Sequence, residues 1–72
     1  GYDRDTARVA TNDFINDNMK MKNEIIVIIH GRGQNIVRNV VHDTLRKNKY
    51  VIEYKIYPYN IGCTIVNLCK NN

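Results

Sequence analysis

Serine and tryptophan are absent from this chain of 72 residues, and cysteine, proline and glycine are scarce. Without serine there is no serine nucleophile and no Ser-His-Asp triad, so serine hydrolase chemistry is excluded. The longest apolar run covers residues 25–29 only, whereas a membrane-spanning helix needs about 20 apolar residues. The first residues also lack the apolar stretch of a secretory signal. We therefore expect no membrane partner.

The two cysteines, Cys63 and Cys69, fall along one expected strand. Extended chain of that length holds their Cα atoms about 20 Å apart, beyond the reach of roughly 7 Å for a disulfide. Unpaired thiols suit a reducing cytoplasm, which is the localisation we expect. Because neither a CxxC pair nor clustered histidines occur, the sequence identifies no cofactor and supports no divalent metal site.

The charge is distributed unevenly along the chain. Eleven Lys and Arg against seven Asp and Glu give a net charge of +4. Residues 1–23 sum to zero, so the whole excess lies in residues 24–72. A local basic excess favours an anionic partner such as nucleic acid, although +4 is also ordinary for a small soluble domain. At this length there is room for one core, and we expect one monomeric domain.

Hydrophobic periodicity predicts two helices. Ala7, Ala10 and Phe14 recur at helical spacing and predict the core-facing stripe of a helix over residues 4–20. A stronger amphipathic pattern predicts a second helix over residues 34–48, with basic residues near its C-terminal end, where the helix dipole favours them.

Three strands are expected. Residues 24–29 contain an unbroken β-branched run, which indicates a strand covered on both faces or well inside a sheet. From residue 51 the apolar pattern alternates, which places Ile52 and Tyr54 on the same face. After a turn with Pro58 and Gly62 at its ends, residues 63–68 form the last strand.

The resulting order α-β-α-β-β predicts an α/β two-layer sandwich with a mixed sheet. The first helix has only three strands to pack upon, and one more strand before it would complete the order β-α-β-α-β-β. We therefore expect residues 1–72 to be a single domain that lacks its N-terminal strand.

The main chemical signal is the loop from His30 through Gly31 and Arg32 to Gly33, between a strand and a helix. A helix start presents unpaired backbone N–H groups, so such a loop is a common meeting point with an anion. The glycines allow positive φ and close approach, Arg32 can offer several donors to a phosphate, and His30 can exchange a proton near neutral pH. The same residues also fit a tight structural turn in which His30 packs or caps. His42, on the second helix, is expected at the surface.

These residues together resemble the small MutS-related (Smr) domain in its short stand-alone bacterial form. The match covers nearly all 72 residues and is firmest at residues 25–33, which look like the HGxG motif of the family, and at residues 59–68. The other motif of the family is an N-terminal strand ending in Leu-Asp-x-His-Gly, of which only Gly1 has a counterpart here. The resemblance implies a sandwich similar to the C-terminal domain of bacterial translation initiation factor three, with a mixed four-stranded sheet when complete.

The resemblance also implies a function. It predicts a nucleic-acid-binding domain whose parent protein is a nicking endonuclease or ribonuclease, with or without a metal, in DNA repair, recombination or ribosome rescue. The Asp and His of the upstream motif are the usual catalytic candidates, so the activity of this stretch is expected to depend on them. His30 and Arg32 are the catalytic candidates present. The expected partner is DNA or RNA backbone, with the ribosome as a further candidate. The predicted nucleic-acid-binding residues are His30, Gly31, Arg32, Gly33, Gln34, Asn35, Arg38, Arg46, Lys47 and Lys49.

Two alternatives stay open. The first is a non-catalytic module that docks on protein or on the ribosome through residues 34–48 and the Tyr-rich hairpin. The second is a small nucleotide-binding domain, although the loop lacks the third glycine of the dinucleotide fingerprint and the Lys-Ser/Thr of the Walker pattern.

Overall fold

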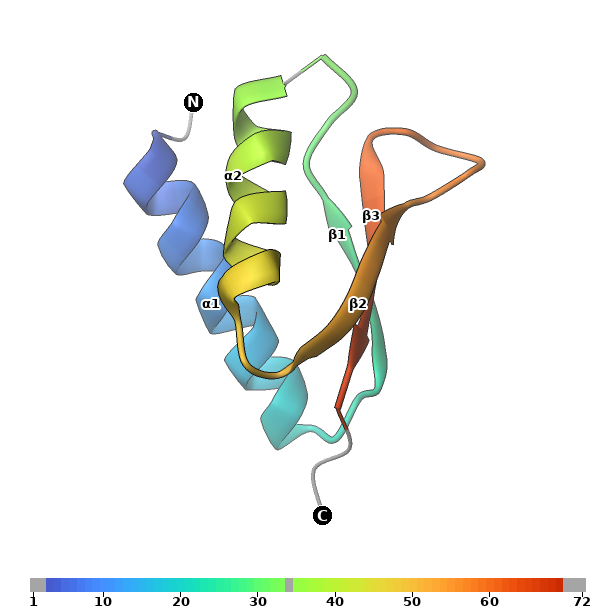
Figure 1. Ribbon diagram of the computed structural model, residues 1–72. Helices are drawn as coiled ribbons and strands as arrows, with labels where there is room; N and C mark the ends of the chain where they lie inside the picture. The colour runs from blue at the N-terminus through green and yellow to red at the C-terminus, as the bar shows by residue number, and fades with distance from the viewer. Residues whose placement is uncertain (1–2, 34, 70–72) are drawn as a thin grey trace.

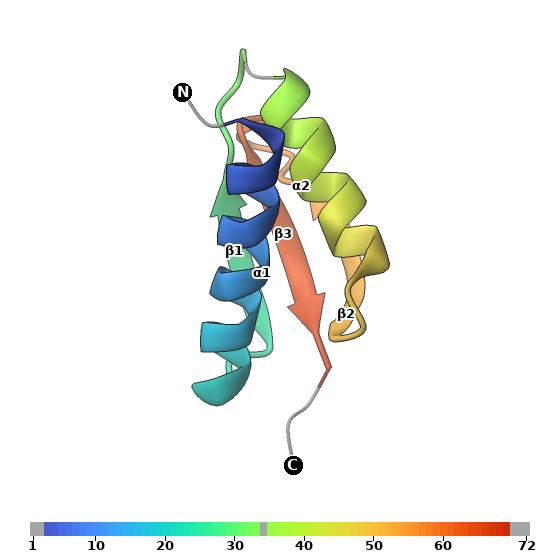
Figure 2. The same ribbon diagram turned by 90° about the vertical axis from the view of Figure 1, so that its left-hand side faces the viewer.

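The chain folds into two layers, with two helices on one face of a three-stranded sheet (Figures 1 and 2). The computed structural model describes residues 3–33 and 35–69. The elements follow the predicted order: α1 (Arg4–Lys20), β1 (Ile25–Ile29), α2 (Asn35–Lys47), β2 (Val51–Ile56) and β3 (Cys63–Leu68). The predicted α/β two-layer sandwich is therefore confirmed. Neither of these helices is long and apolar enough to cross a bilayer, as far as the described residues go.

The sheet has the order β1-β3-β2, so the last strand lies in the middle. β3 runs antiparallel to both neighbours. Ile28 on β1 and Ile56 on β2 therefore lie opposite Thr64, one on each side of it. β1 and β2 therefore point in the same direction but are separated by β3. A parallel pair, which the predicted mixed sheet requires, does not occur among the described strands.

α1 begins and ends as predicted, but its buried stripe differs. The Asp3 carboxylate accepts a hydrogen bond of 2.7 Å from the Thr6 N–H, which caps the helix and lowers the pKa of Asp3 because the bond favours the charged form. Ala7 is buried as expected, whereas Ala10 and Phe14 are exposed. The prediction of an Ala7-Ala10-Phe14 core stripe was thus wrong beyond its first residue. The buried residues of α1 are Ala7, Thr11, Ile15, Asn18 and Met19.

β1 is less buried than its β-branched sequence predicts. Its only pairing among the described residues is with β3, so its other edge has no strand beside it. The helices cover one face of the sheet, where Ile26 is buried. On the opposite face Ile25 and Val27 are exposed, and Ile29 is 81% exposed. The expectation of a strand covered on both faces was therefore wrong in this part of the chain.

A β-bulge changes which residues of β2 face the helices. The register shifts between Val51 and Glu53, so that Tyr54 lies opposite Val66 on the helix-facing side. Ile52 falls in the bulge and stays exposed, which contradicts the prediction that it shares the face of Tyr54. The helix-facing side of the sheet and the two helices together enclose one hydrophobic core, made of Ile15, Met19, Ile26, Val41, Leu45, Val66 and Leu68.

Candidate nucleic-acid interface

The loop between β1 and α2 is held in place by the turn between β2 and β3. The Gly62 carbonyl accepts two hydrogen bonds, from the His30 N–H at 2.9 Å and from the Gly31 N–H at 3.0 Å. Gly31 has a φ of 89°, in the left-handed region that favours glycine. One carbonyl oxygen thus fixes the direction in which the loop leaves the sheet. It also occupies the N–H of Gly31, one of the residues predicted to bind nucleic acid.

Gly62 allows the two loops to approach closely. A Cβ atom at this position would lie 2.9 Å from the Arg32 Cγ and 3.2 Å from the Arg32 backbone nitrogen. Any larger residue would therefore push against the strand-to-helix loop. Sequence reasoning treated Gly62 as the end of a turn and missed this contact, although a glycine placed just before a buried strand was the available signal.

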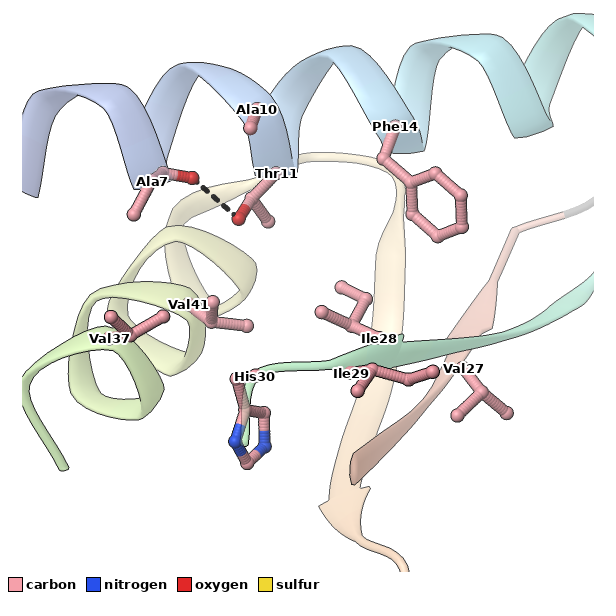
Figure 3. Close-up of a pocket in the computed structure, with 10 residues that line it drawn as sticks. All are labelled: Ala7, Ala10, Thr11, Phe14, Val27, Ile28, Ile29, His30, Val37 and Val41. Atoms are coloured by element: carbon pink, nitrogen blue, oxygen red, sulfur yellow. Dashed lines mark hydrogen bonds between the residues drawn. The ribbon is translucent and has the colours of Figure 1, made fainter. Parts of the chain in front are cut away.

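His30 lies at the end of β1 and is only 6% exposed. Its Nδ1 is 3.1 Å from the Gly31 carbonyl oxygen, and its Nε2 is 2.8 Å from the Thr64 Oγ1. Figure 3 places the ring on the side of β1 that points away from α1. Both ring nitrogens therefore have partners within the protein, and the imidazole forms part of the loop's support.

His42 belongs to the same cluster. Its Nε2 lies 2.7 Å from the Thr64 Oγ1, and its ring is edge-on to that of His30, with 5.8 Å between the centroids. Its ring also contacts Tyr54 on β2 at 5.1 Å. Burial, followed by the nearby His30 and Arg38, lowers the pKa of His42 below its ordinary value of 6.5. His42 is half-buried, so the expectation that it is a surface residue holds only in part: its ring contacts Thr64 and Tyr54 of the sheet.

The predicted cations fall into two groups. Arg32 is exposed and Arg38 is half-buried, and neither forms an ion pair within residues 3–33 and 35–69. Near the C-terminal end of α2, Asp43 forms ion pairs with Arg46 and with Lys47. The remaining predicted residues lie as follows: Gly33 and Asn35 are exposed, the Lys49 Nζ lies 5.1 Å from the ring centroid of Tyr50, and Gln34 is outside the described residues.

An apolar groove runs along the free edge of β1. It has a volume of about 350 Å³ and lies between α1, β1 and the first half of α2 (Figure 3). The exposed Ala10 and Phe14 of α1 line it together with Val27 and Ile29. The groove contains no cation and one histidine, so its lining suits apolar chain rather than a phosphate.

Among the described residues, no group of three or more His, Cys, Asp or Glu side chains is placed to hold a metal ion. The two cysteines among them are free thiols. The chemistry that the site offers is therefore hydrogen bonding and positive charge from Arg32, a helix start at Asn35, and a buried imidazole behind them.

Comparison with known proteins identifies the fold. A family model described as the Smr domain matches residues 1–69. The chain belongs to the Smr domain family. A crystal structure of the Smr domain of Thermus thermophilus MutS2 superimposes with a TM-score of 0.89 at 21% identity, covering 96% of this chain and 90% of that chain. This likeness confirms the Smr fold of the two-layer sandwich.

Curated relatives of this Smr domain are named Endonuclease MutS2. The protein of Clostridium acetobutylicum is 26% identical over 70 residues, which cover 97% of this chain and 9% of the relative. That of Streptococcus equi subsp. equi is 46% identical over 44 residues, which cover 57% of this chain and 6% of the relative. The chain thus spans less than a tenth of the length of these relatives.

Proposed function

We propose that this Smr domain binds the phosphate backbone of nucleic acid through Arg32, Gly33 and the first turn of α2. The observation that supports it best is the setting of Arg32. This cation is exposed and has no ion-pair partner among the described residues, and it lies on a loop that the Gly62 carbonyl holds beside a helix start. A guanidinium carried by a held loop next to the N–H groups of a helix start matches the charge and the hydrogen-bond acceptors of a phosphate.

The roles of the other predicted residues follow from their surroundings. His30 is buried with both ring nitrogens engaged, so it supports the loop instead of exchanging a proton with the nucleic acid. Arg38 extends the positive surface along α2. Arg46 and Lys47 contribute less, because Asp43 neutralises part of their charge. Backbone contacts of this kind position a nucleic acid without reading its sequence.

The name of the relatives, Endonuclease MutS2, supports a wider proposal for the parent protein. We propose that it cleaves a phosphodiester backbone and that Arg32 neutralises charge on the reacting phosphate. The free edge of β1 and the apolar groove beside it have the shape and the lining for one more strand. An upstream strand ending in Asp-x-His-Gly at this edge would bring catalytic side chains close to the loop.

A salt series tests the binding proposal. The affinity of the chain for labelled duplex and single-stranded nucleic acid should fall steeply as salt rises, because binding releases counterions. Arg32→Ala should weaken binding by roughly tenfold and reduce the salt slope by about one. Arg8→Ala is the matched control, since Arg8 is also exposed but lies on α1 and is paired with Asp5. An affinity that changes neither with salt concentration nor in Arg32→Ala would contradict the proposal.

Cleavage needs a separate comparison. Nicking of a supercoiled plasmid and cleavage of RNA should be measured for residues 1–72 and for a chain that begins a dozen residues earlier in its gene. Activity confined to the longer chain would assign the chemistry to the upstream strand. Equal activity of both would contradict that assignment and point back to Arg32 and His30.

A protein-docking module is the second candidate function. The exposed side chains of Ile25, Val27 and Ile29 on β1 favour it, because soluble domains rarely leave such a row uncovered. Binding to a protein partner that persists in high salt after nuclease treatment would support docking over nucleic-acid recognition.

A further inference from the structure

Three side chains from three elements form a continuous hydrogen-bonded chain beneath the loop. His30 directly follows β1, Thr64 lies on the central strand β3, and His42 lies on α2. The Thr64 hydroxyl is fully buried and lies 2.8 Å from the His30 Nε2 and 2.7 Å from the His42 Nε2. The proposed phosphate contacts use neither Thr64 nor His42, and the roles of these two residues are still to be assigned.

The donors and acceptors of this hydrogen-bonded chain can be arranged in only one way when both rings are neutral. The Gly31 carbonyl oxygen can only accept, so the His30 Nδ1 carries the proton and donates to it. The His30 Nε2 is then an acceptor, and the Thr64 hydroxyl donates to it. The Thr64 oxygen in turn accepts from the His42 Nε2–H. Both tautomers and the direction of the hydroxyl follow from the single carbonyl of Gly31.

We propose that His42 is a positioning residue of the phosphate site, which acts through Thr64 to hold His30 in the tautomer that binds the Gly31 carbonyl and so fixes the Gly31–Gly33 loop. The inference rests on the proposed function for its effect on nucleic acid. The hydrogen bond from His30 anchors the carbonyl of Gly31, and the Gly62 carbonyl anchors its N–H. Gly31 is thereby held on both sides at a φ of 89°, and Arg32 follows directly.

The groups around His42 determine how the hydrogen-bonded chain changes when one of its rings gains a proton. His30, just after β1, and Tyr54 from β2 have ring contacts with His42, and Arg38, one turn earlier on α2, adds a positive charge that disfavours the protonated ring. Arg38 and a protonated His30 would oppose a second positive charge there. A proton added at the His42 Nδ1 leaves the hydrogen-bonded order intact. A proton added at the His30 Nε2 turns this nitrogen into a donor, so the Thr64 hydroxyl can no longer donate to it and the hydrogen-bonded order changes.

The ring nitrogens report directly on this arrangement. In the unmodified chain at pH 7.5, NMR of ¹⁵N-labelled histidine should find His30 protonated at Nδ1 and His42 protonated at Nε2. Thr64→Val removes the connecting hydroxyl, so His30 should lose its single tautomer and the amide signals of Gly31, Arg32 and Gly33 should shift. Thr44→Val is the matched control, because Thr44 is also buried and, among the described residues, its hydroxyl bonds only to the Val40 carbonyl of its own helix.

Substitutions at His42 keep the inference testable if Thr64→Val does not fold. His42→Gln retains an N–H donor for the Thr64 oxygen and should preserve the His30 tautomer and the loop signals. His42→Phe keeps a ring but has no donor, and it should reproduce the loop shifts of Thr64→Val. Unchanged His30 nitrogens and unchanged loop amides in Thr64→Val or in His42→Phe would overturn the inference.

Binding then connects the cluster to function. Loss of one supporting hydrogen bond should weaken the affinity of His42→Phe for duplex nucleic acid about fivefold, whereas His42→Gln and Thr44→Val should stay within about twofold of the unmodified chain. Equal affinity of His42→Phe and His42→Gln would contradict the positioning role. Failure of the unmodified chain to bind any nucleic acid would overturn the proposed function, and the ring and loop signals would then decide the present inference by themselves.

Discussion

The two ends of α2 carry cations in different settings. At the N-terminal end, Arg32 and Arg38 have no ion-pair partner among the residues described, and the loop before the helix is fixed by backbone hydrogen bonds. At the C-terminal end, Asp43 pairs with Arg46 and Lys47. The comparison shows that equal numbers of basic residues can differ in how much of their charge is already paired. Pairing and fixed geometry distinguish the two ends, and both favour the N-terminal end.

The largest effect is expected from disturbing the contact that builds the N-terminal end. In Gly62→Ala the new Cβ would meet Arg32, including its backbone nitrogen at 3.2 Å, so the loop must move. We expect the free energy of unfolding to fall by about 2 kcal/mol, as is typical of overpacking. Gly33→Ala is the control, because no atom lies within 4 Å of a Cβ placed there. Urea unfolding of both variants measures the difference, and equal losses would show that the contact does not hold the loop.

Next in size is the difference between cations at the two ends. Arg38→Ala should weaken nucleic-acid binding about fivefold, because it removes an unpaired charge near the loop. Arg46→Ala should change the affinity by less than about twofold, since Asp43 already neutralises part of that charge. Fluorescence anisotropy with a labelled duplex at a fixed salt concentration compares the two. If Arg46→Ala proved the more harmful, the site would belong at the C-terminal end.

A smaller gain is expected when the C-terminal cations are released. Asp43→Asn removes the carboxylate that pairs with Arg46 and Lys47, and these pairs hold the pKa of Asp43 below its ordinary value. Both cations would then be available, and affinity at low salt should rise about twofold and return to that of the unmodified chain at high salt. Asp5→Asn, which releases Arg8 on α1 instead, is the control. A gain of the same size in both variants would indicate net charge alone.

The smallest effect concerns pH. The folded state lowers the pKa of His42, so the unfolded chain binds a proton more readily between the folded pKa and the ordinary value of 6.5. Stability should therefore be fully present above about pH 6.5 and decline as the pH falls below it. Thermal unfolding from pH 7.5 to 5 measures this, and His42→Gln should flatten part of the decline. An unchanged pH profile in His42→Gln would assign the decline to other groups.

The sequence predicted the secondary structure well because its signals are local. α1 extends over the predicted residues 4–20, and the turn before β3 follows from Pro58 and Gly62. Burial was predicted less well, since it depends on which strands are neighbours. The run in β1 suggested two covered faces, yet the helices cover one, and the bulge at Val51 moved Ile52 to the surface.

The candidate site was predicted in part. The loop with Arg32 was found from its glycines, because that signal lies within four residues. The cluster behind it was not, since Thr64 lies 34 residues from His30 and 22 from His42. Only the antiparallel register of β1 with β3 brings them together. A threonine in an apolar strand has no local feature that distinguishes a connecting hydroxyl from ordinary packing.

The paired hydrogen bonds at the Gly62 carbonyl also limit how the chain can vary in length. Because one oxygen joins the connection between β2 and β3 to the loop before α2, an inserted residue in either segment would draw that oxygen away from both amides. Among the described residues, the connection between α2 and β2 makes no backbone hydrogen bond to that loop. We therefore expect additions and deletions among Smr domains of this type to collect near residues 48–50, while the spacing from Tyr57 to Cys63 stays constant.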